Sequence, residues 1–209
     1  IEFRKEWDCI CTHYTAFAVS PAVGNNGRMW SDVERNIADF LKGAQKPLIA
    51  IVGPTASGKT DISLNIAERF GGEIVNADSR QLYEGMDIGT GKIRNEQMRG
   101  VPHHLLSVLH PMERVSIAWY KPEAEKVIEE IRMREKVPLL VGGSMLYVSS
   151  IVDGLEPLPS DRTIRSRLER EASTDEGRLH MHERLKAIDP ETAARIPLQN
   201  TVYLCRALE

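Results

Sequence analysis

The sequence contains little cysteine, no long apolar run and no excess of either charge. Its 209 residues include three cysteines, Cys9, Cys11 and Cys205, which do not form the pattern of a disulfide framework. A reducing cytoplasm is therefore the expected compartment. The longest apolar runs, such as PLIAIV and VPLLV, have the length of strands and not the ~20 residues that span a bilayer, so we expect no membrane partner. The net charge of −3 disfavours a protein coated in nucleic acid, although it is compatible with a local basic patch.

The first 29 residues show no clear periodicity and end in a Gly/Asn cluster that is typical of a turn. We treat residues 1–29 as an unassigned arm, which is either a non-native addition before Met29 or a partly disordered extension. Cys9, Cys11 and His13 offer metal-ligating atoms within this arm. Their spacing is unusual for zinc and a fourth ligand is not evident, so the pattern disfavours a structural metal there.

Residues 30–155 alternate strand-length apolar runs with amphipathic helical segments. Ser31 and Glu34 form a capping box that predicts the start of a helix at Ser31. Strands are expected at KPLIAIV, EIVNAD and VPLLVGG, and further helices at KTDISLNIAERF, EKVIEEIRMREK and SMLYVSSIVDG. This alternation predicts an α/β fold with a parallel sheet covered by helices on both faces.

The pattern changes after Gly154, where EPLPSD forms a proline-rich break. The remaining segments show helical periodicity without a strand signal. We assign residues 156–200 to a small all-helical insertion and residues 201–209 to the start of a return to the core. From Glu156 to Glu209 there are nine Lys and Arg against ten Asp and Glu, so this part of the chain is not basic in bulk.

The stretch GPTASGKT matches the phosphate-loop pattern and lies between an expected strand and an expected helix. Backbone N–H groups from Gly53 to Gly58 can point inward as an anion-binding nest, and the helix N-terminus adds its dipole. Lys59 supplies a point charge, and the Thr60 hydroxyl can join a magnesium shell, so Mg²⁺ is the expected cofactor. The weaker interpretation is a glycine-rich turn without a ligand. The predicted phosphate-binding residues are Gly53, Pro54, Thr55, Ala56, Ser57, Gly58, Lys59 and Thr60.

A nucleotide hydrolase also needs a carboxylate at the end of an apolar strand to support Mg²⁺. The strand VPLLV ends in Gly142 and Gly143 instead, and the strand-ending carboxylate of the chain is Asp78. In a doubly wound sheet Asp78 would open onto the same crevice as the phosphate loop. From there it can support a metal ion, accept a proton or simply cap a turn.

Five segments carry a resemblance to a known family. In chain order they are GPTASGKT, NADSRQLYEGMDIGTGK, GVPHHLL, PLLVGGSMLY, and DPETAARI with RALE. Together they resemble the tRNA dimethylallyltransferase (tRNA isopentenyltransferase) family in its bacterial form, over about residues 46–209. The family continues well beyond RALE, so the chain resembles a member truncated at its C-terminus.

The resemblance implies a prenyl transfer from dimethylallyl diphosphate to N6 of the adenosine 3′-adjacent to the anticodon, position 37 of tRNA, with release of diphosphate and no use of ATP. The expected partners are the anticodon stem-loop of tRNA and the prenyl donor, and a monomer is expected. Asp78 would be the catalytic base, and Thr55 would assist departure at the bridging oxygen. The phosphate loop would hold the diphosphate, with Mg²⁺ at Thr60.

The resemblance also implies which residues contact tRNA, namely Asp78, Ser79, Arg80, Gln81, Ser144, Arg165 and Arg206. Ser144 replaces a more usual threonine and keeps its hydroxyl. Tyr203 stands where the family usually has an arginine, which puts one tRNA contact in doubt. His103 and His104 match the PHH of the family, with ordinary packing as an equal interpretation. Arg165 could instead be one charge on a solvated helix face.

Two other functions stay open at this point. A P-loop small-molecule kinase would bind ATP and would not respond to the prenyl donor. A catalytically silent module would bind diphosphate without turnover.

Overall fold

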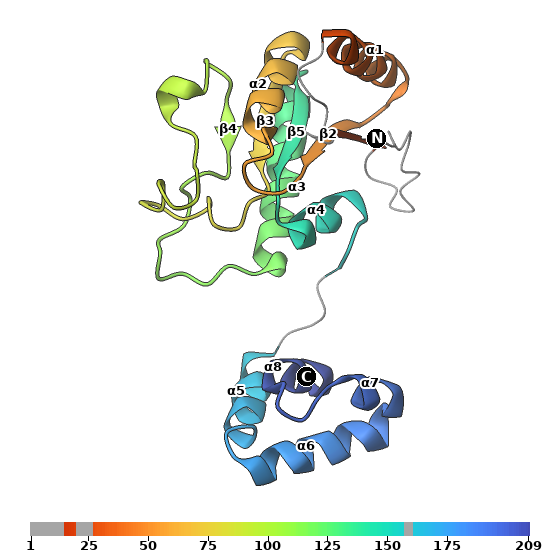
Figure 1. The fold of residues 1–209 in the computed structure, drawn as a ribbon, viewed down its shortest axis with the longest axis vertical. Coiled ribbons are helices and arrows are strands. Elements are labelled where there is room, and N and C mark those ends of the chain that lie inside the picture. The colour runs from red at the N-terminus through yellow and green to blue at the C-terminus, as the bar shows by residue number, and fades with distance from the viewer. Residues whose placement is uncertain (1–14, 20–26, 157–160) are drawn as a thin grey trace. The chain divides into compact units, whose positions relative to one another are not determined.

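The structure is a computed structural model that describes residues 15–19, 27–156 and 161–209. The chain divides into two compact units, with the boundary between residues 157 and 158. We call the first the α/β unit and the second the helical unit (Figure 1). Cys9, Cys11 and His13, the weak metal candidate of the arm, lie outside the described residues.

The α/β unit is built on a five-stranded parallel sheet in the order β1-β2-β5-β3-β4. The strands are β1 Thr15–Val19, β2 Pro47–Val52, β3 Gly72–Asn76, β4 His103–His104 and β5 Val137–Gly142. The central strands β2, β5 and β3 are the three that were predicted, in register at Ile49↔Leu139 and Ile74↔Leu139. Such strands are buried on both faces and therefore read as continuous apolar runs.

The two edge strands, β1 and β4, were not predicted from the sequence. Strand β1 lies in the arm that was left unassigned and pairs in parallel with β2, from Thr15↔Pro47 to Val19↔Ile51. Strand β4 has two residues, which pair with β3 at Ile74↔His103 and Val75↔His104. A two-residue strand is too short to show a hydrophobic period, so pattern alone does not reveal it.

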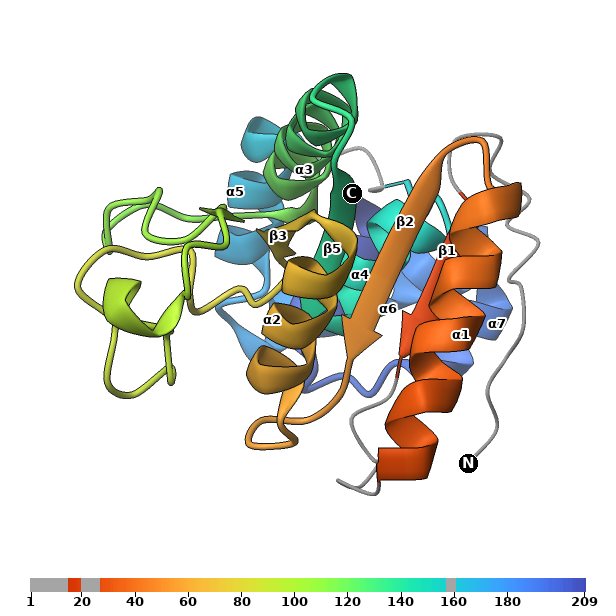
Figure 2. The same cartoon turned by 90° about the horizontal axis from the view of Figure 1, so that it is seen from above.

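Helices cover both faces of the sheet, which confirms the predicted fold class. They are α1 Gly27–Gly43, α2 Lys59–Phe70, α3 Ile117–Met133 and α4 Met145–Val152. Along β2 the side chains alternate: Ile49 and Ile51 pack in one core cluster with residues of α1 and α2, and Leu48 and Ala50 pack in the other with residues of α3 and α4. The layers can be followed in Figure 2.

The predicted start of the first helix at Ser31 is wrong, because α1 begins at Gly27. Trp30 packs against the same core cluster as Val33 and Ile37, and these three residues are spaced as one helix face. Placing Trp30 on that face requires the helix to continue N-terminally past Ser31. Tertiary packing therefore overrides the local capping signal.

The helical unit consists of α5 Arg162–Glu171, α6 Asp175–Ile188, α7 Pro190–Arg195 and α8 Thr201–Leu208. Each helix is preceded by an N-cap residue whose side chain accepts a hydrogen bond from a backbone N–H of the first turn. In chain order these N-cap residues are Asp161, Thr174, Asp189 and Asn200. We expected residues 201–209 to begin a return to the core. Leu204 and Cys205 of α8 are instead buried in the core of the helical unit, with Leu168 and Met181, so this segment completes that unit.

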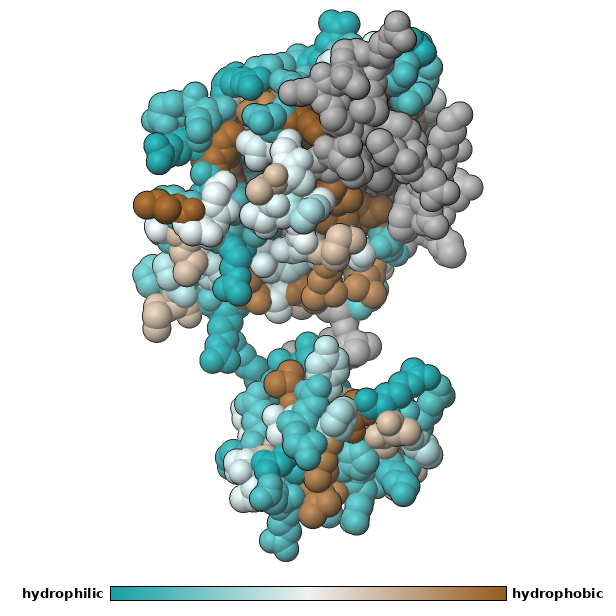
Figure 3. All heavy atoms as spheres, in the orientation of Figure 1, coloured by the Kyte–Doolittle hydropathy of each residue, from teal (hydrophilic) through white to brown (hydrophobic). Residues whose placement is uncertain are grey.

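The surface is mainly polar on the face shown in Figure 3, with hydrophobic residues in scattered groups. Across the described ranges, no helix has both the length and the apolar character needed to cross a membrane.

Candidate active site at the carboxyl end of the sheet

Three predicted site segments follow the three central strands. The phosphate loop, residues 53–60, follows β2, the segment 78–81 follows β3, and Gly143–Ser144 follows β5. The strands are parallel neighbours, with Val52 opposite Gly142 and Asn76 opposite Val141. Their carboxyl ends therefore lie at one edge of the sheet, the usual place for ligands in open α/β folds.

The phosphate loop has the backbone of an anion-binding nest. Ala56 and Gly58 have φ values of 62° and 85°, and Gly58 precedes the first residue of α2. A left-handed φ strains alanine and not glycine, and such residues turn successive N–H groups inward. The Ser57 Oγ is buried and has no hydrogen-bond partner in the part of the chain that the structure describes. The loop thus combines the left-handed backbone of a nest with a buried, unpaired hydroxyl, although the N–H of Ser57 itself donates to Pro54 O at 3.3 Å.

Lys59 lies at the first position of α2, and its Nζ donates a hydrogen bond to Pro54 O at 2.7 Å. The ammonium is therefore folded back over the loop, where it can meet a terminal phosphate. Thr60 follows and is exposed, and Thr55 is exposed at the tip of the loop. These positions leave the atoms of both threonines accessible to a ligand in the loop.

The end of β5 has no room for a side chain. A Cβ on Gly142 would lie 2.1 Å from Ala77 O, and one on Gly143 would lie 3.2 Å from Gly53 O. The close approach is held by hydrogen bonds from Ala77 N to Val141 O and from Ser144 N to Ala77 O. A carboxylate side chain at position 142 would therefore collide with the chain beyond β3.

Asp78 is held in a turn by the buried amide of Asn76, which is 4% exposed. The Asn76 Oδ1 accepts from Asp78 N, and its Nδ2 donates to Asp78 O and Leu105 O, all within 3.0 Å. One oxygen of Asp78, Oδ1, accepts from Arg80 N at 2.9 Å. The carboxylate therefore does cap a turn, and this leaves Oδ2 able to accept a proton.

Tyr120, stacked on Tyr147, is hydrogen-bonded to the residue that holds this turn. Tyr120 OH donates to Asn76 O at 2.9 Å, and the Tyr120 and Tyr147 rings stack with centroids 4.0 Å apart. Burial raises the pKa of both phenols, so Tyr120 stays a neutral donor. The sequence analysis missed Asn76 and Tyr120 as supporting residues. A polar residue inside the apolar run EIVNAD was the available signal for Asn76.

Ser144 joins the segment after β5 to the segment after β3. Its Oγ accepts from Ser79 N at 2.9 Å and lies 3.3 Å from Ser79 Oγ. Gln81 donates through Nε2 to Thr90 O at 3.0 Å. The structure thus brings together the predicted residues Asp78, Ser79, Arg80, Gln81 and Ser144, with Arg80 exposed.

Lys92 organises the long segment between β3 and β4, and the sequence analysis missed it. Its side chain is 5% exposed, and its Nζ donates to Tyr83 O and Ser107 Oγ and pairs with Asp87. A buried ammonium must be paired in this way to stay charged.

An open pocket of about 430 Å³ lies beside this segment, lined by Thr60, Asp61, Leu64, Gly91, Lys92, Ile93, Glu96, Gln97 and Arg99. Thr60, the last residue of the phosphate loop, therefore lines a cavity together with residues of α2 and of this segment.

His103 and His104 make internal hydrogen bonds. His103 Nδ1 lies 2.8 Å from Val101 O, and burial lowers the pKa of this histidine. His104 Nε2 lies 2.7 Å from Oε2 of Glu73, which also accepts from Arg134 Nη2 at 2.7 Å. Burial by itself raises the pKa of Glu73, but the hydrogen bonds from Arg134 and His104 outweigh it and leave that pKa below its usual value. These contacts fit the packing interpretation of the two histidines.

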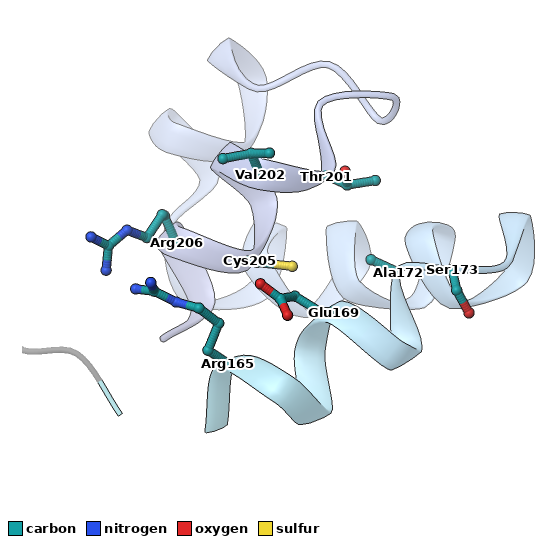
Figure 4. Close-up of a pocket in the computed structure, with 8 residues that line it drawn as sticks. All are labelled: Arg165, Glu169, Ala172, Ser173, Thr201, Val202, Cys205 and Arg206. Carbon is teal, nitrogen blue, oxygen red and sulfur yellow. The ribbon is translucent and has the colours of Figure 1, made fainter. Parts of the chain in front are cut away.

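The predicted residues Arg165 and Arg206 lie in the helical unit, on α5 and α8. Both guanidinium groups pair with one carboxylate, that of Glu209, and both line a pocket between these helices (Figure 4). Tyr203, which replaces an expected arginine, is exposed on α8. The structure thus unites Arg165 with Arg206, and the sequence analysis missed the carboxylate that joins them.

Mg²⁺ can be tested against the residues present. Within the described ranges, no group of three or more His, Cys, Asp or Glu side chains is arranged to bind a metal. Mg²⁺ in phosphate sites, however, is held by one or two protein groups together with ligand phosphates and water. The exposed Thr60 hydroxyl beside a nest of N–H groups fits that donor set.

Comparisons with known proteins show which proteins the chain resembles. The family model described as "IPP transferase" matches residues 81–209, and the model described as "Isopentenyl transferase" matches residues 46–108. A tRNA dimethylallyltransferase of Thermomicrobium roseum is 45% identical over 167 residues, which are 79% of this chain and 50% of that protein. One from Corynebacterium efficiens is 50% identical over 161 residues, 77% of this chain and 53% of that protein.

Two solved structures are also similar. A full-length tRNA isopentenylpyrophosphate transferase from Bacillus halodurans has 43% identity and a TM-score of 0.53, over 79% of this chain and 55% of that chain. A eukaryotic dimethylallyltransferase acting on tRNA has 26% identity and a TM-score of 0.66, over 78% of this chain and 40% of that chain. The chain therefore spans about half the length of the curated relatives it matches.

Proposed function

The chain belongs to the IPP transferase family, and on that premise we propose that it transfers a dimethylallyl group from dimethylallyl diphosphate to N6 of adenosine 37 in the anticodon loop of tRNA, releasing diphosphate. One observation supports the proposal. The phosphate loop and the Asp78 segment follow the two strands that flank β5, and the close approach of Gly142 to Ala77 leaves no space for a carboxylate at position 142. That arrangement suits a leaving group better than ATP hydrolysis.

On the donor side, charge builds up on diphosphate oxygens as the allylic C–O bond breaks. Groups that are already oriented toward this charge stabilise it most, because they need no reorganisation during the reaction. We assign this role to backbone N–H groups of the phosphate loop, Pro54 excepted because proline has none, and to the ammonium of Lys59. Thr55 is proposed to donate to the bridging oxygen. Thr60 would hold Mg²⁺, which supplies further neutralisation of diphosphate charge when bound.

On the acceptor side, adenosine N6 is a weak nucleophile because its lone pair is delocalised into the ring. As N6 forms its bond to C1 of the prenyl group, the C1–O bond breaks, and the electron pair leaves with diphosphate. The proton lost by N6 would pass to Oδ2 of Asp78, since Oδ1 is engaged by Arg80 N. Asn76 and Tyr120 would keep the carboxylate in place.

The target base has to leave its stack to reach the donor, as in other enzymes that modify a base. Ser79, Arg80, Gln81 and Ser144 are proposed to contact it, together with Asp78. Arg165 and Arg206 are proposed as tRNA contacts of the helical unit. We further propose that the protein acts as a monomer in the cytoplasm. Its few cysteines and its lack of long apolar runs support the compartment, whereas the monomer is carried over from the family resemblance.

The decisive experiment is incubation of the chain with labelled dimethylallyl diphosphate and an unmodified anticodon stem-loop RNA, read by mass spectrometry. We expect a product heavier by one dimethylallyl group on adenosine 37. A thermal shift with ATP and none with the prenyl donor would instead favour a small-molecule kinase. A shift with diphosphate and no product would favour the catalytically silent module.

A further inference from the structure

The carboxylate of Glu209 is the most tightly enclosed charged group of the helical unit. Its side chain is 2% exposed and receives donors from three directions. Arg165 Nη2 and Nε donate to Oε2 at 2.5 and 3.1 Å, Arg206 Nη1 donates to the same oxygen at 2.9 Å, and Asp161 N donates to Oε1 at 2.9 Å. One residue therefore links the start of α5 to both arginines.

A carboxylate removed from water in this way is stable only when it is paired and hydrogen-bonded. The hydrogen bonds from Arg165, followed by that from Arg206, keep the pKa of Glu209 below its usual value, so the group is ionised at neutral pH. Because both guanidinium groups meet at Oε2, they are held close together despite their like charge. Two unpaired arginines at this spacing would repel each other.

The two arginines keep part of their surface free for a ligand. Their side chains are 33% and 46% exposed, and neither uses all five of its N–H donors on Glu209. In Figure 4 both guanidinium groups point to the same side of the pocket between α5 and α8. This pocket has a volume of about 350 Å³, and Ser173 and Thr201 add hydroxyl groups to its lining.

We propose that Arg165 and Arg206 act as one site for a phosphodiester of the RNA substrate, with Glu209 as the positioning residue that sets the spacing of the two guanidinium groups. The inference rests on the proposed function, because it takes RNA as the substrate. Arginine suits this task, since its planar fork matches the oxygens of a phosphate in two-point contacts. The unit as a whole is not basic, so its attraction for a phosphate has to come from the placement of these two arginines and not from net charge.

The proposal can be separated from simple electrostatics because the two make opposite predictions. The substitution Glu209→Gln removes one negative charge, and bulk electrostatics therefore predict tighter binding of any RNA. If Glu209 sets the geometry of the site, the same change weakens binding of the anticodon stem-loop despite the added positive charge. A matched control is Glu169→Gln, since Glu169 lines the same pocket but makes no hydrogen bond to either arginine in the described structure.

The experiment measures the Kd of an anticodon stem-loop RNA by fluorescence anisotropy for the full chain and both variants, at low and at physiological salt. We expect Glu209→Gln to raise Kd roughly tenfold, because the two guanidinium groups lose the spacing needed for two-point phosphate contacts, and Glu169→Gln to leave Kd equal or lower. Equal or tighter binding by Glu209→Gln overturns the proposal. The prenyl-donor thermal shift of the α/β unit, measured on the same samples, reports separately on the proposed function.

A second set of variants covers the case in which Glu209→Gln unfolds the helical unit, which circular dichroism would reveal. Arg165→Lys and Arg206→Lys keep the charge but lose the two-point geometry, and the double variant completes a cycle. One shared site predicts that the loss in the double variant is clearly smaller than the product of the single losses. Independent, multiplicative losses overturn the proposal, as does a wild-type chain that binds no stem-loop.

Discussion

The predicted site residues are held in place by backbone geometry in the α/β unit and by ion pairs in the helical unit. In the α/β unit, backbone geometry dominates: three strand ends meet at one edge, Gly142 lets the segment after β3 come close, and Asn76 holds the turn of Asp78 through main-chain atoms. In the helical unit, side-chain charge dominates, because Glu209 pairs with both Arg165 and Arg206. The first site therefore depends on the residues that shape its backbone, Gly142 and Asn76, whereas the second depends on each partner of a charge pair.

The hydrophobic cores of the two units also differ, in size. The sheet of the α/β unit is buried between two hydrophobic clusters, whereas the helical unit has one small cluster centred on Leu168, Met181, Leu185 and Leu204. Small units bury a smaller fraction of their surface and are correspondingly marginal. The helical unit therefore depends more on its caps and ion pairs.

The largest expected effect is on chemistry in the α/β unit. Asp78→Asn keeps an acceptor for Arg80 N and so preserves the turn, but it removes the proton acceptor. We expect turnover of the stem-loop to fall about 10²–10⁴-fold, while the Kd of the prenyl donor stays unchanged. Single-turnover kinetics and donor titration measure the two separately. A parallel loss of donor binding and turnover would mean that Asp78 has a structural or metal-supporting role instead.

The next largest effect is expected on the free energy of unfolding, for one glycine substitution in each unit. A Cβ at Gly142 would lie 2.1 Å from Ala77 O, and a Cβ at Gly177 would lie 1.8 Å from Glu171 O. Both neighbours are backbone atoms and cannot move aside, so each Gly→Ala change should lower the free energy of unfolding by about 3 kcal/mol. Gly142→Ala should also weaken donor binding, and Gly177→Ala should not.

Urea unfolding followed by circular dichroism measures these losses. Gly43→Ala is the control, because no atom lies within 4 Å of a Cβ at that position and its φ is not positive. If Gly142→Ala is as stable as this control, the inferred collision at position 142 does not occur.

The smallest expected effect is on the pH dependence of stability, to which one enclosed carboxylate of each unit contributes. The pKa values of Glu73 and Glu209 are both held below the usual glutamate value by side-chain hydrogen bonds, which outweigh the effect of burial. The unfolded chain therefore binds more protons, so the stabilisation is complete above about pH 4.5 and is lost as pH falls through the lower folded-state pKa. We expect Glu73→Gln to flatten this acid dependence in the α/β unit and Glu209→Gln to flatten it in the helical unit.

Urea midpoints measured between pH 3 and pH 7, roughly the range in which carboxyl groups titrate, test this expectation. An unchanged acid slope in both variants would show that other carboxyl groups control acid unfolding.

The three central strands, α2 and the phosphate loop could be predicted because each is encoded by a contiguous pattern. The apolar runs of β2, β3 and β5 are continuous since both sheet faces are covered. The start of α1 was misplaced because the burial of Trp30 outweighed the capping box at Ser31. Lys92 was missed because its partners, Tyr83 and Ser107, are distant in the chain and carry no spacing rule.

The sequence by itself determined the phosphate loop and its place between a strand and a helix, because the geometry of such a loop depends on neighbouring residues. It also carried the family resemblance, through five segments in a fixed order. Only the tertiary structure decided that Gly142 approaches Ala77 and that Glu209 reaches Arg165 across 44 residues. Contacts of this kind depend on how separate elements pack, and packing follows from the summed burial of the whole unit, which no local pattern records.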